Sequence, residues 1–135
     1  MKTKIFFAIG AAALIVAGAG CVQTVTEKQA LGVPFNRDYL EGRYERSVDQ
    51  VFDAAKTVLG RSGTLKNEAI IHGQTNTVKT LEAKVNQRNV YVRVSSMTPT
   101  LTAIAVQARH PAGGSDMPLA HQLEKEIALA LVGTR

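Results

Sequence analysis

Apolar residues follow a helical spacing in one segment after residue 46. They recur at intervals of three and four between Ser47 and Leu59, which predicts an amphipathic helix. Ser47 followed by Gln50 fits a capping box at its start, and Gly60 and Gly63 are expected to end it. The apolar stripe consists of Val48, Val51, Phe52, Ala55, Val58 and Leu59.

Residues 64–109 have no helical stripe and are predicted to form strands instead. Val90, Val92 and Val94 alternate with polar or amphipathic residues, as expected for a half-buried strand. The predicted strands cover residues 65–72, 75–86, 89–96 and 100–109, with a short first strand within 39–46. Short connections at 86–89 and 96–99 favour antiparallel neighbours.

A second amphipathic helix is predicted from about Pro118 to Val132, with Ser115 or Asp116 as its cap and Gly133 as its end. The predicted order is a helix, four strands and a helix, with or without one strand in front. This order predicts a single α+β domain over residues 39–135: a two-layer sandwich in which two amphipathic helices cover one face of an antiparallel sheet of four or five strands.

The N-terminus has the three parts of a secretory signal peptide: two lysines, an apolar run and small residues at its end. The run, residues 5–20, is shorter than the roughly 20 apolar residues that a membrane-spanning helix needs, so a permanent anchor is the weaker interpretation. Two processing sites compete. Cleavage after Ala19 would follow an A-x-A pattern, whereas Gly18-Ala19-Gly20-Cys21 resembles a bacterial lipobox.

Cys21 is the only cysteine of the chain, and this favours the lipoprotein route. A solitary free thiol is a reactive liability in the oxidising compartment outside the inner membrane, whereas an acylated cysteine would serve as an anchor. Gly18 departs from the lipobox pattern, in which an aliphatic residue is usual. Val22, rather than Asp, after the cysteine favours the outer membrane, with the domain facing the periplasm.

The predicted organisation is therefore a lipoprotein signal peptide at residues 1–20 and a lipidated N-terminus with a tether at 21–38. Acyl chains such as palmitate on Cys21 would hold the chain at the membrane. The tether has no sustained periodicity, which is typical of a spacer. A partner-binding segment around Val33, Phe35 and Tyr39 is the alternative.

Composition excludes several classes of protein. With 45% hydrophobic and 20% charged residues in a chain of 135, wholesale disorder is not expected. One cysteine excludes a disulfide framework and a cysteine-based zinc cage. The aromatic content of 5%, the absence of Trp and the export signal argue against a nucleic-acid partner. The net charge of +5 falls to +3 when Lys2 and Lys4 leave with the signal peptide.

The order of segments behind a lipidated N-terminus resembles an uncharacterised family of small bacterial envelope lipoproteins, known only as a domain of unknown function. The matching segments are residues 47–59 (SVDQVFDAAKTVL), 89–94 (NVYVRV) and 102–106 (TAIAV), the last continuing into a Gly-Gly-Ser-Asp loop and the final helix. The resemblance covers about 90 residues. It implies a fold and an envelope location, but no functional residue, because the family has no established activity.

Nothing in the sequence indicates catalysis, a metal or a cofactor. His72, His110 and His121 lack the close spacing of a metal site. Ser115 lacks a nucleophile-elbow arrangement, and the glycines before it suit a turn and helix cap better than an anion site. The acidic pairs, Asp49 with Asp53 and Glu124 with Glu126, are expected on solvated helix faces. We therefore expect no enzyme.

Basic residues in the strand region form the candidate partner-binding surface. They are Lys79, Lys84, Arg88, Arg93 and Arg109. Such a surface suits anionic lipid, lipopolysaccharide, peptidoglycan or an acidic envelope protein, and a solvated strand face interspersed with Glu82 is the alternative. The sequence thus predicts a non-enzymatic, membrane-tethered binding or assembly module. A carrier or sensor that binds a small envelope ligand between sheet and helices is the second hypothesis.

Overall fold

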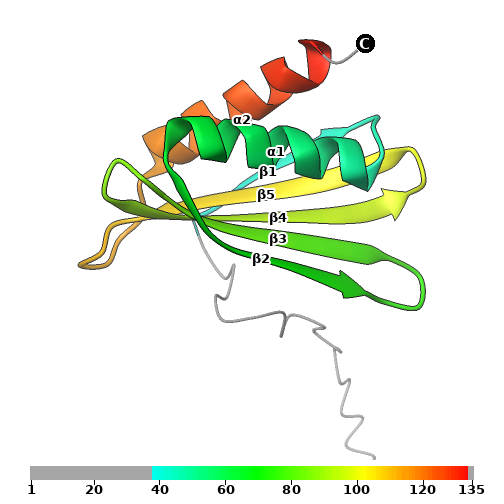
Figure 1. Cartoon of the computed structure of the whole chain (residues 1–135), viewed down its shortest axis with the longest axis horizontal. Helices are drawn as coiled ribbons and strands as arrows, with labels where there is room; N and C mark the ends of the chain where they lie inside the picture. The colour runs from blue at the N-terminus through cyan, green and yellow to red at the C-terminus, as the bar shows by residue number, and fades with distance from the viewer. Residues whose placement is uncertain (1–37, 134–135) are drawn as a thin grey trace, which may run out of the picture.

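One antiparallel sheet and two helices make up residues 38–133, the part of the chain that the computed structural model describes (Figure 1). In chain order the elements are β1 (Leu40–Tyr44), α1 (Val48–Ser62), β2 (Thr64–His72), β3 (Thr77–Val85), β4 (Arg88–Thr98), β5 (Leu101–Arg109) and α2 (Met117–Gly133). The predicted α+β fold is confirmed. The predicted signal peptide, Cys21 and tether segment before residue 38 lie outside the described residues.

The strand order across the sheet is β1-β5-β4-β3-β2. Strands β2 to β5 follow one another as antiparallel hairpins, whereas β1 pairs with β5, the last strand of the chain. Both helices lie on the same side of the sheet (Figure 1). The sheet therefore has a covered face, packed against α1 and α2, and an open face on the opposite side.

Helix α1 begins with the predicted capping box. The Ser47 hydroxyl accepts a hydrogen bond from the Gln50 backbone N–H at 3.3 Å, and the Gln50 side chain accepts one from the Ser47 N–H at 3.2 Å. The expectation that Gly60 ends the helix is wrong, because α1 continues to Ser62 and Gly63 follows as its C-cap. A Cβ at Gly63 would lie 2.1 Å from the Lys84 carbonyl oxygen, so this close approach of α1 and β3 requires glycine.

Helix α2 is capped by Asp116, one of the two predicted candidates. Its Oδ1 accepts a hydrogen bond from the Leu119 backbone N–H at 3.1 Å. The preceding loop turns at Gly113 and Gly114, whose φ angles of 102° and 89° lie in a region that other residues rarely adopt. The glycines of this loop therefore serve the turn, as the sequence predicted.

The turn between β3 and β4 is shorter than the predicted connection of 86–89. It consists of Asn86 and Gln87, whose φ angles of 49° and 64° match a two-residue hairpin turn of type I′. Arg88 and Asn89 already belong to β4. This tight turn fixes the register in which Lys84 lies opposite Asn89.

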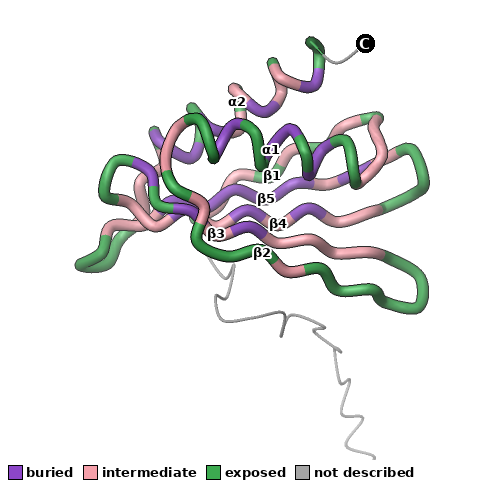
Figure 2. Tube along the Cα trace, viewed as in Figure 1, coloured by how far each residue is buried: buried purple, intermediate pink, exposed green. Residues whose placement is uncertain are grey.

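The hydrophobic core lies between the covered face and the helices (Figure 2). It includes the alternating valines of β4 and the predicted stripe of α1 except Val48, which is partly buried and packs against the core. Helix α2 contributes Leu119, Ala120, Leu123, Ile127 and Leu131. Burying such a set of aliphatic side chains is the main term that stabilises a small domain of this kind.

Candidate functional site

The open face carries most of the polar side chains of the three central strands. Residues that lie directly opposite one another on neighbouring strands point to the same side of the sheet, so the register defines rows across the open face. From β3 to β5 the first row is Lys84, Asn89 and Arg109; the second is Glu82, Tyr91 and Gln107; the third is Thr80, Arg93 and Ala105.

The structure separates the five basic residues of the candidate partner-binding surface. Lys84, Arg93 and Arg109 share the open face. Lys79 and Arg88 belong instead to the side of the helices, because they alternate in register with the buried core residues of β3 and β4. The same alternation is visible in the sequence, where Lys79 stands two residues before Leu81 and Arg88 two before Val90.

Lys79 is bound to helix α1. Its Nζ lies 2.6 Å from Asp49 Oδ1 and 4.8 Å from the centroid of the Phe52 ring. The ammonium thus has an ion pair on one side and an aromatic face on another. Its side chain is only 14% exposed, so this cation serves the contact between β3 and α1.

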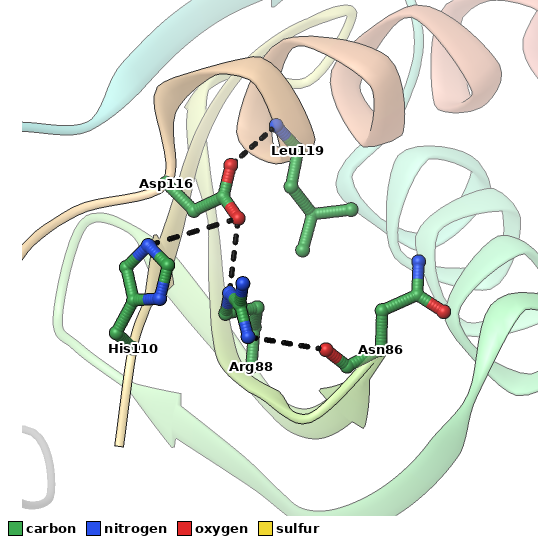
Figure 3. A network of polar contacts seen from close by, with 5 residues as sticks. All are labelled: Asn86, Arg88, His110, Asp116 and Leu119. Carbon is green, nitrogen blue, oxygen red and sulfur yellow. Dashed lines mark hydrogen bonds and ion pairs between the residues drawn. The ribbon is translucent and has the colours of Figure 1, made fainter. Parts of the chain in front are cut away.

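Arg88 holds the start of α2 (Figure 3). Its Nε donates a hydrogen bond to Asp116 Oδ2 at 3.0 Å, and its Nη1 donates one to the Asn86 carbonyl oxygen at 3.5 Å. His110 Nε2 lies 4.0 Å from the same carboxylate oxygen. The hydrogen bond from the Leu119 backbone N–H has the largest effect on the pKa of Asp116 and lowers it below its usual value. The hydrogen bond and charge of Arg88 and the charge of His110 lower the pKa further, whereas burial acts in the opposite direction. This cluster joins the β3–β4 turn to α2.

Two open-face residues of β5 are buried although no helix covers them. Gln107 is 0% and Ala105 is 5% exposed. In the register Gln107 lies opposite Tyr91 of β4, between the rows of Arg93 and Arg109, so large side chains surround it. Alternation along residues 100–109 predicts one buried face for this strand, made of Thr102, Ile104, Val106 and Ala108. The uncharged run from Leu101 to Ala108 was the signal of a strand buried on both sides.

Tyr91 stands at the centre of this polar surface. Burial and the nearby charge of Glu82 raise the pKa of its phenol, and the positive charge of Arg109 acts in the opposite direction. The phenol therefore stays protonated and can donate a hydrogen bond. Tyr91, Glu82 and Arg109 thus form one electrostatically coupled group on the open face.

Lys79 and Arg88 each pair with a carboxylate, whereas neither Lys84 nor Arg109 has a carboxylate partner within residues 38–133. The Nε of Arg109 is buried and has no hydrogen-bond partner in that part of the chain. A buried donor left without an acceptor costs free energy, so the Arg109 Nε is an unsatisfied polar group in this part of the sheet.

The expectation of solvated acidic residues on both helices is wrong for Glu124. Its carboxylate accepts a hydrogen bond from the Tyr44 hydroxyl in a partly buried contact between α2 and β1. Burial, together with the hydrogen bond and charge of Glu124, raises the pKa of Tyr44 well above its usual value. Asp49 has a partner in Lys79, and Glu126 accepts hydrogen bonds from Ser62 and Gln122. These carboxylates hold elements together.

The described residues give little support for a metal site, a membrane-spanning helix or a ligand cavity between sheet and helices. No group of three His, Cys, Asp or Glu side chains within 38–133 is placed to hold a metal ion. Neither α1 nor α2 is long and apolar enough to span a bilayer. Buried aliphatic side chains fill the space between sheet and helices, where a carrier would hold its ligand. The open face is therefore the best candidate for a site.

Comparison with known proteins gives no further guidance. No protein-family model matches the chain, and no curated protein sequence matches it.

Proposed function

We propose that the chain is a non-enzymatic envelope lipoprotein, anchored through acyl chains on Cys21, whose domain binds a partner on its open face. The observation that carries the binding part is the open face itself: it presents Lys84, Arg93 and Arg109 beside Tyr91 on a rigid sheet. Rigid elements hold side chains in fixed positions at low entropic cost, which favours recognition.

The anchoring part is supported by the sequence before residue 38. A positively charged start, an apolar run and a lone Cys21 after small residues fit a lipoprotein signal. Fully extended, the 17 residues from Val22 to Asp38 span roughly 55 Å, enough to place the domain at or above the lipid head groups. Membership of the small envelope-lipoprotein family that the segment order resembles belongs to the same proposal, as does an outer-membrane location facing the periplasm.

Anchoring is tested with the Cys21→Ser variant expressed in a Gram-negative host. We expect the wild-type chain to partition into the detergent phase and to incorporate labelled palmitate, and the variant to do neither. Equal partitioning and equal mobility of the two chains would exclude lipidation. Shortening of both chains to the same size without label would indicate ordinary cleavage after Ala19.

Partner binding is tested by photocross-linking in cells. A photoreactive residue at Thr80, which lies on the open face opposite Arg93, is compared with one at Gln122, an exposed position of α2. We expect a discrete adduct with an envelope component from Thr80 and none from Gln122. The same adducts from both positions, or none from Thr80, would remove the open face as the binding surface.

A further inference from the structure

The first row of the open face, Lys84–Asn89–Arg109, has the composition of an anion site; we name it the basic row. Its members come from β3, β4 and β5 and lie directly opposite one another. Neighbouring strands are about 4.8 Å apart, so two strand spacings, roughly 10 Å, separate the outer cations. Lys and Arg side chains are long enough to converge from that distance above the central amide.

The basic row contains no acidic residue. Its two cations have no ion pair within residues 38–133, whereas Lys56, Lys79 and Arg88 each pair with a carboxylate. Glu82 lies one row away, opposite Tyr91, and no ion pair joins it to Lys84 or Arg109. Within residues 38–133, both cations of the basic row are therefore left without a carboxylate partner.

Arg109 gives the row a fixed donor as well as a charge. Its Nε is shielded from water and has no acceptor among the described residues. Its backbone is held twice, by the β4 ladder opposite Asn89 and by a bridge to Ser115. The guanidinium carries further N–H donors on its two Nη atoms, and the planar fork of a guanidinium matches the oxygen atoms of a phosphate group.

We propose that the basic row binds a phosphate group, with the Arg109 guanidinium and the Lys84 ammonium on its oxygens and the Asn89 amide between them. This inference rests on the proposed function, because it takes the open face as the binding surface. Two cations flanking a neutral donor suit a group with several oxygens and up to two negative charges better than a carboxylate, which has two oxygens and one charge.

The position of the basic row in the fold connects the ligand with the anchored end of the chain. Leu40, the first residue of β1, lies opposite Val106, three residues before Arg109 on the adjacent strand. The chain from Cys21 thus joins the sheet beside the row. Phosphate groups at this end come from one of two sources, phospholipid head groups at the membrane or a free phosphate ester.

The test uses the full chain, isotopically labelled and held in non-ionic detergent micelles. Nuclear magnetic resonance follows the Nε–H of Arg109 and the side-chain amide of Asn89. The probes are inorganic phosphate, dihexanoyl phosphatidylglycerol, zwitterionic dihexanoyl phosphatidylcholine and acetate. We expect saturable shifts of both signals with phosphate or with the phosphatidylglycerol, and weaker ones with the other two probes.

The variants are Arg109→Gln and Lys84→Gln, with Arg43→Gln as the matched control. Arg43 also lies on the open face, but on β1, where it pairs with Glu41 at 3.5 Å. We expect Arg109→Gln and Lys84→Gln each to raise the dissociation constant about tenfold, which corresponds to the loss of one charge-assisted contact. Lys84 is exposed, so its variant is informative even if Arg109→Gln fails to fold.

The outcomes separate the sources and the two proposals. Saturation by inorganic phosphate supports a free phosphate ester as ligand, and saturation by phosphatidylglycerol alone supports the lipid head group. Equal shifts with acetate, an unchanged dissociation constant in both row variants, or no shift with any probe would overturn the phosphate assignment. If cross-linking from Thr80 succeeded in that case, the open face would remain a binding surface for another ligand. If both experiments failed, both proposals would fall.

Discussion

The Tyr44 hydroxyl donates a hydrogen bond to the Glu124 carboxylate across 80 residues of sequence. The contact joins β1, an edge strand, to the middle of α2, and it is partly buried. Because β1 pairs with only one neighbour, β5, this bond is a second attachment of the strand to the domain. The edge strand is therefore held from its side by the sheet and from above by a helix.

Replacing Tyr44 by Phe is expected to destabilise the domain by about 1–3 kcal/mol, because the partly buried Glu124 carboxylate loses its donor. Glu124→Gln keeps an acceptor at the same place and serves as the milder control. Chemical unfolding monitored by circular dichroism measures both. Equal stability of wild type and Tyr44→Phe would show that water replaces the phenol without cost.

The Tyr44 contact also predicts a dependence on alkaline pH. The pKa of Tyr44 is raised in the folded chain above its usual 10.0, so the folded state holds the proton more tightly than the unfolded state. The stabilisation that the Tyr44–Glu124 contact gives to the folded state is fully present below about pH 10, and it is lost as the pH rises further. The stability advantage of wild type over Tyr44→Phe should therefore be constant up to about pH 10 and shrink above it. An advantage that grows above pH 10 would contradict the assignment.

Gly42 lies beside the same contact, and a Cβ there would displace the Glu124 carboxylate. A Cβ at this position would be 2.8 Å from Glu124 Oε1 and 3.3 Å from both Ile104 Cγ2 and the Tyr44 hydroxyl. We expect Gly42→Ala to cost about 1–3 kcal/mol through overpacking. Gly60→Ala is the matched control, since its Cβ would meet only Leu65 Cδ1 at 3.9 Å. In an exposed helix position it should stabilise the domain by about 0.5–1 kcal/mol, as measured by urea unfolding.

The stability of the domain is expected to depend on pH in the acid range because of Asp116. Its pKa lies below the usual 3.8 in the folded chain, so its stabilising contribution is present above about pH 4 and is lost as the pH falls through the folded value. We expect Asp116→Ala to lower the melting temperature at pH 7 by several degrees, with less loss for Asp116→Asn, which still caps α2. The difference between wild type and either variant should shrink below pH 4. A difference independent of pH would show that the carboxylate charge has no part in holding α2.

Truncating side chains on the two faces of α2 should affect stability to very different extents. Ile127 is 0% exposed within the core, whereas Leu129, two residues along, is 62% exposed. Ile127→Ala is expected to cost about 2–5 kcal/mol through lost burial and the cavity it leaves. Leu129→Ala should change the stability by no more than about 0.5 kcal/mol. Thermal unfolding compares them, and a large loss at Leu129 would reveal a contact beyond residues 38–133.

The helices and the strand pattern were predictable because their signals are local. The stripe of α1, its capping box and the alternating valines of β4 depend on neighbours a few residues away, and the structure confirms them. The end of α1 was not predictable in the same way. Gly60 and Gly63 look alike in sequence, and only the approach of the Lys84 carbonyl shows which of them the fold requires.

The candidate site was predictable only in part because strand pairing is a long-range property. Period-two alternation alone separates Lys79 and Arg88 from Lys84, Arg93 and Arg109, so that division was available from the sequence. The burial of Gln107 and the alignment of the basic row depend on which strands are neighbours. No local pattern records that order, and none predicted that Glu124 would meet Tyr44.

The pairing of β1 with β5 delays the completion of the sheet while the chain is synthesised. Leu40 is made early, yet its partner Val106 follows 66 residues later. Until then β1 has no strand to join, whereas β2 to β5 can pair in the order in which they emerge. Delayed arrival of the final hairpin would leave β1 as an unprotected strand, open to proteases and to the edges of other copies.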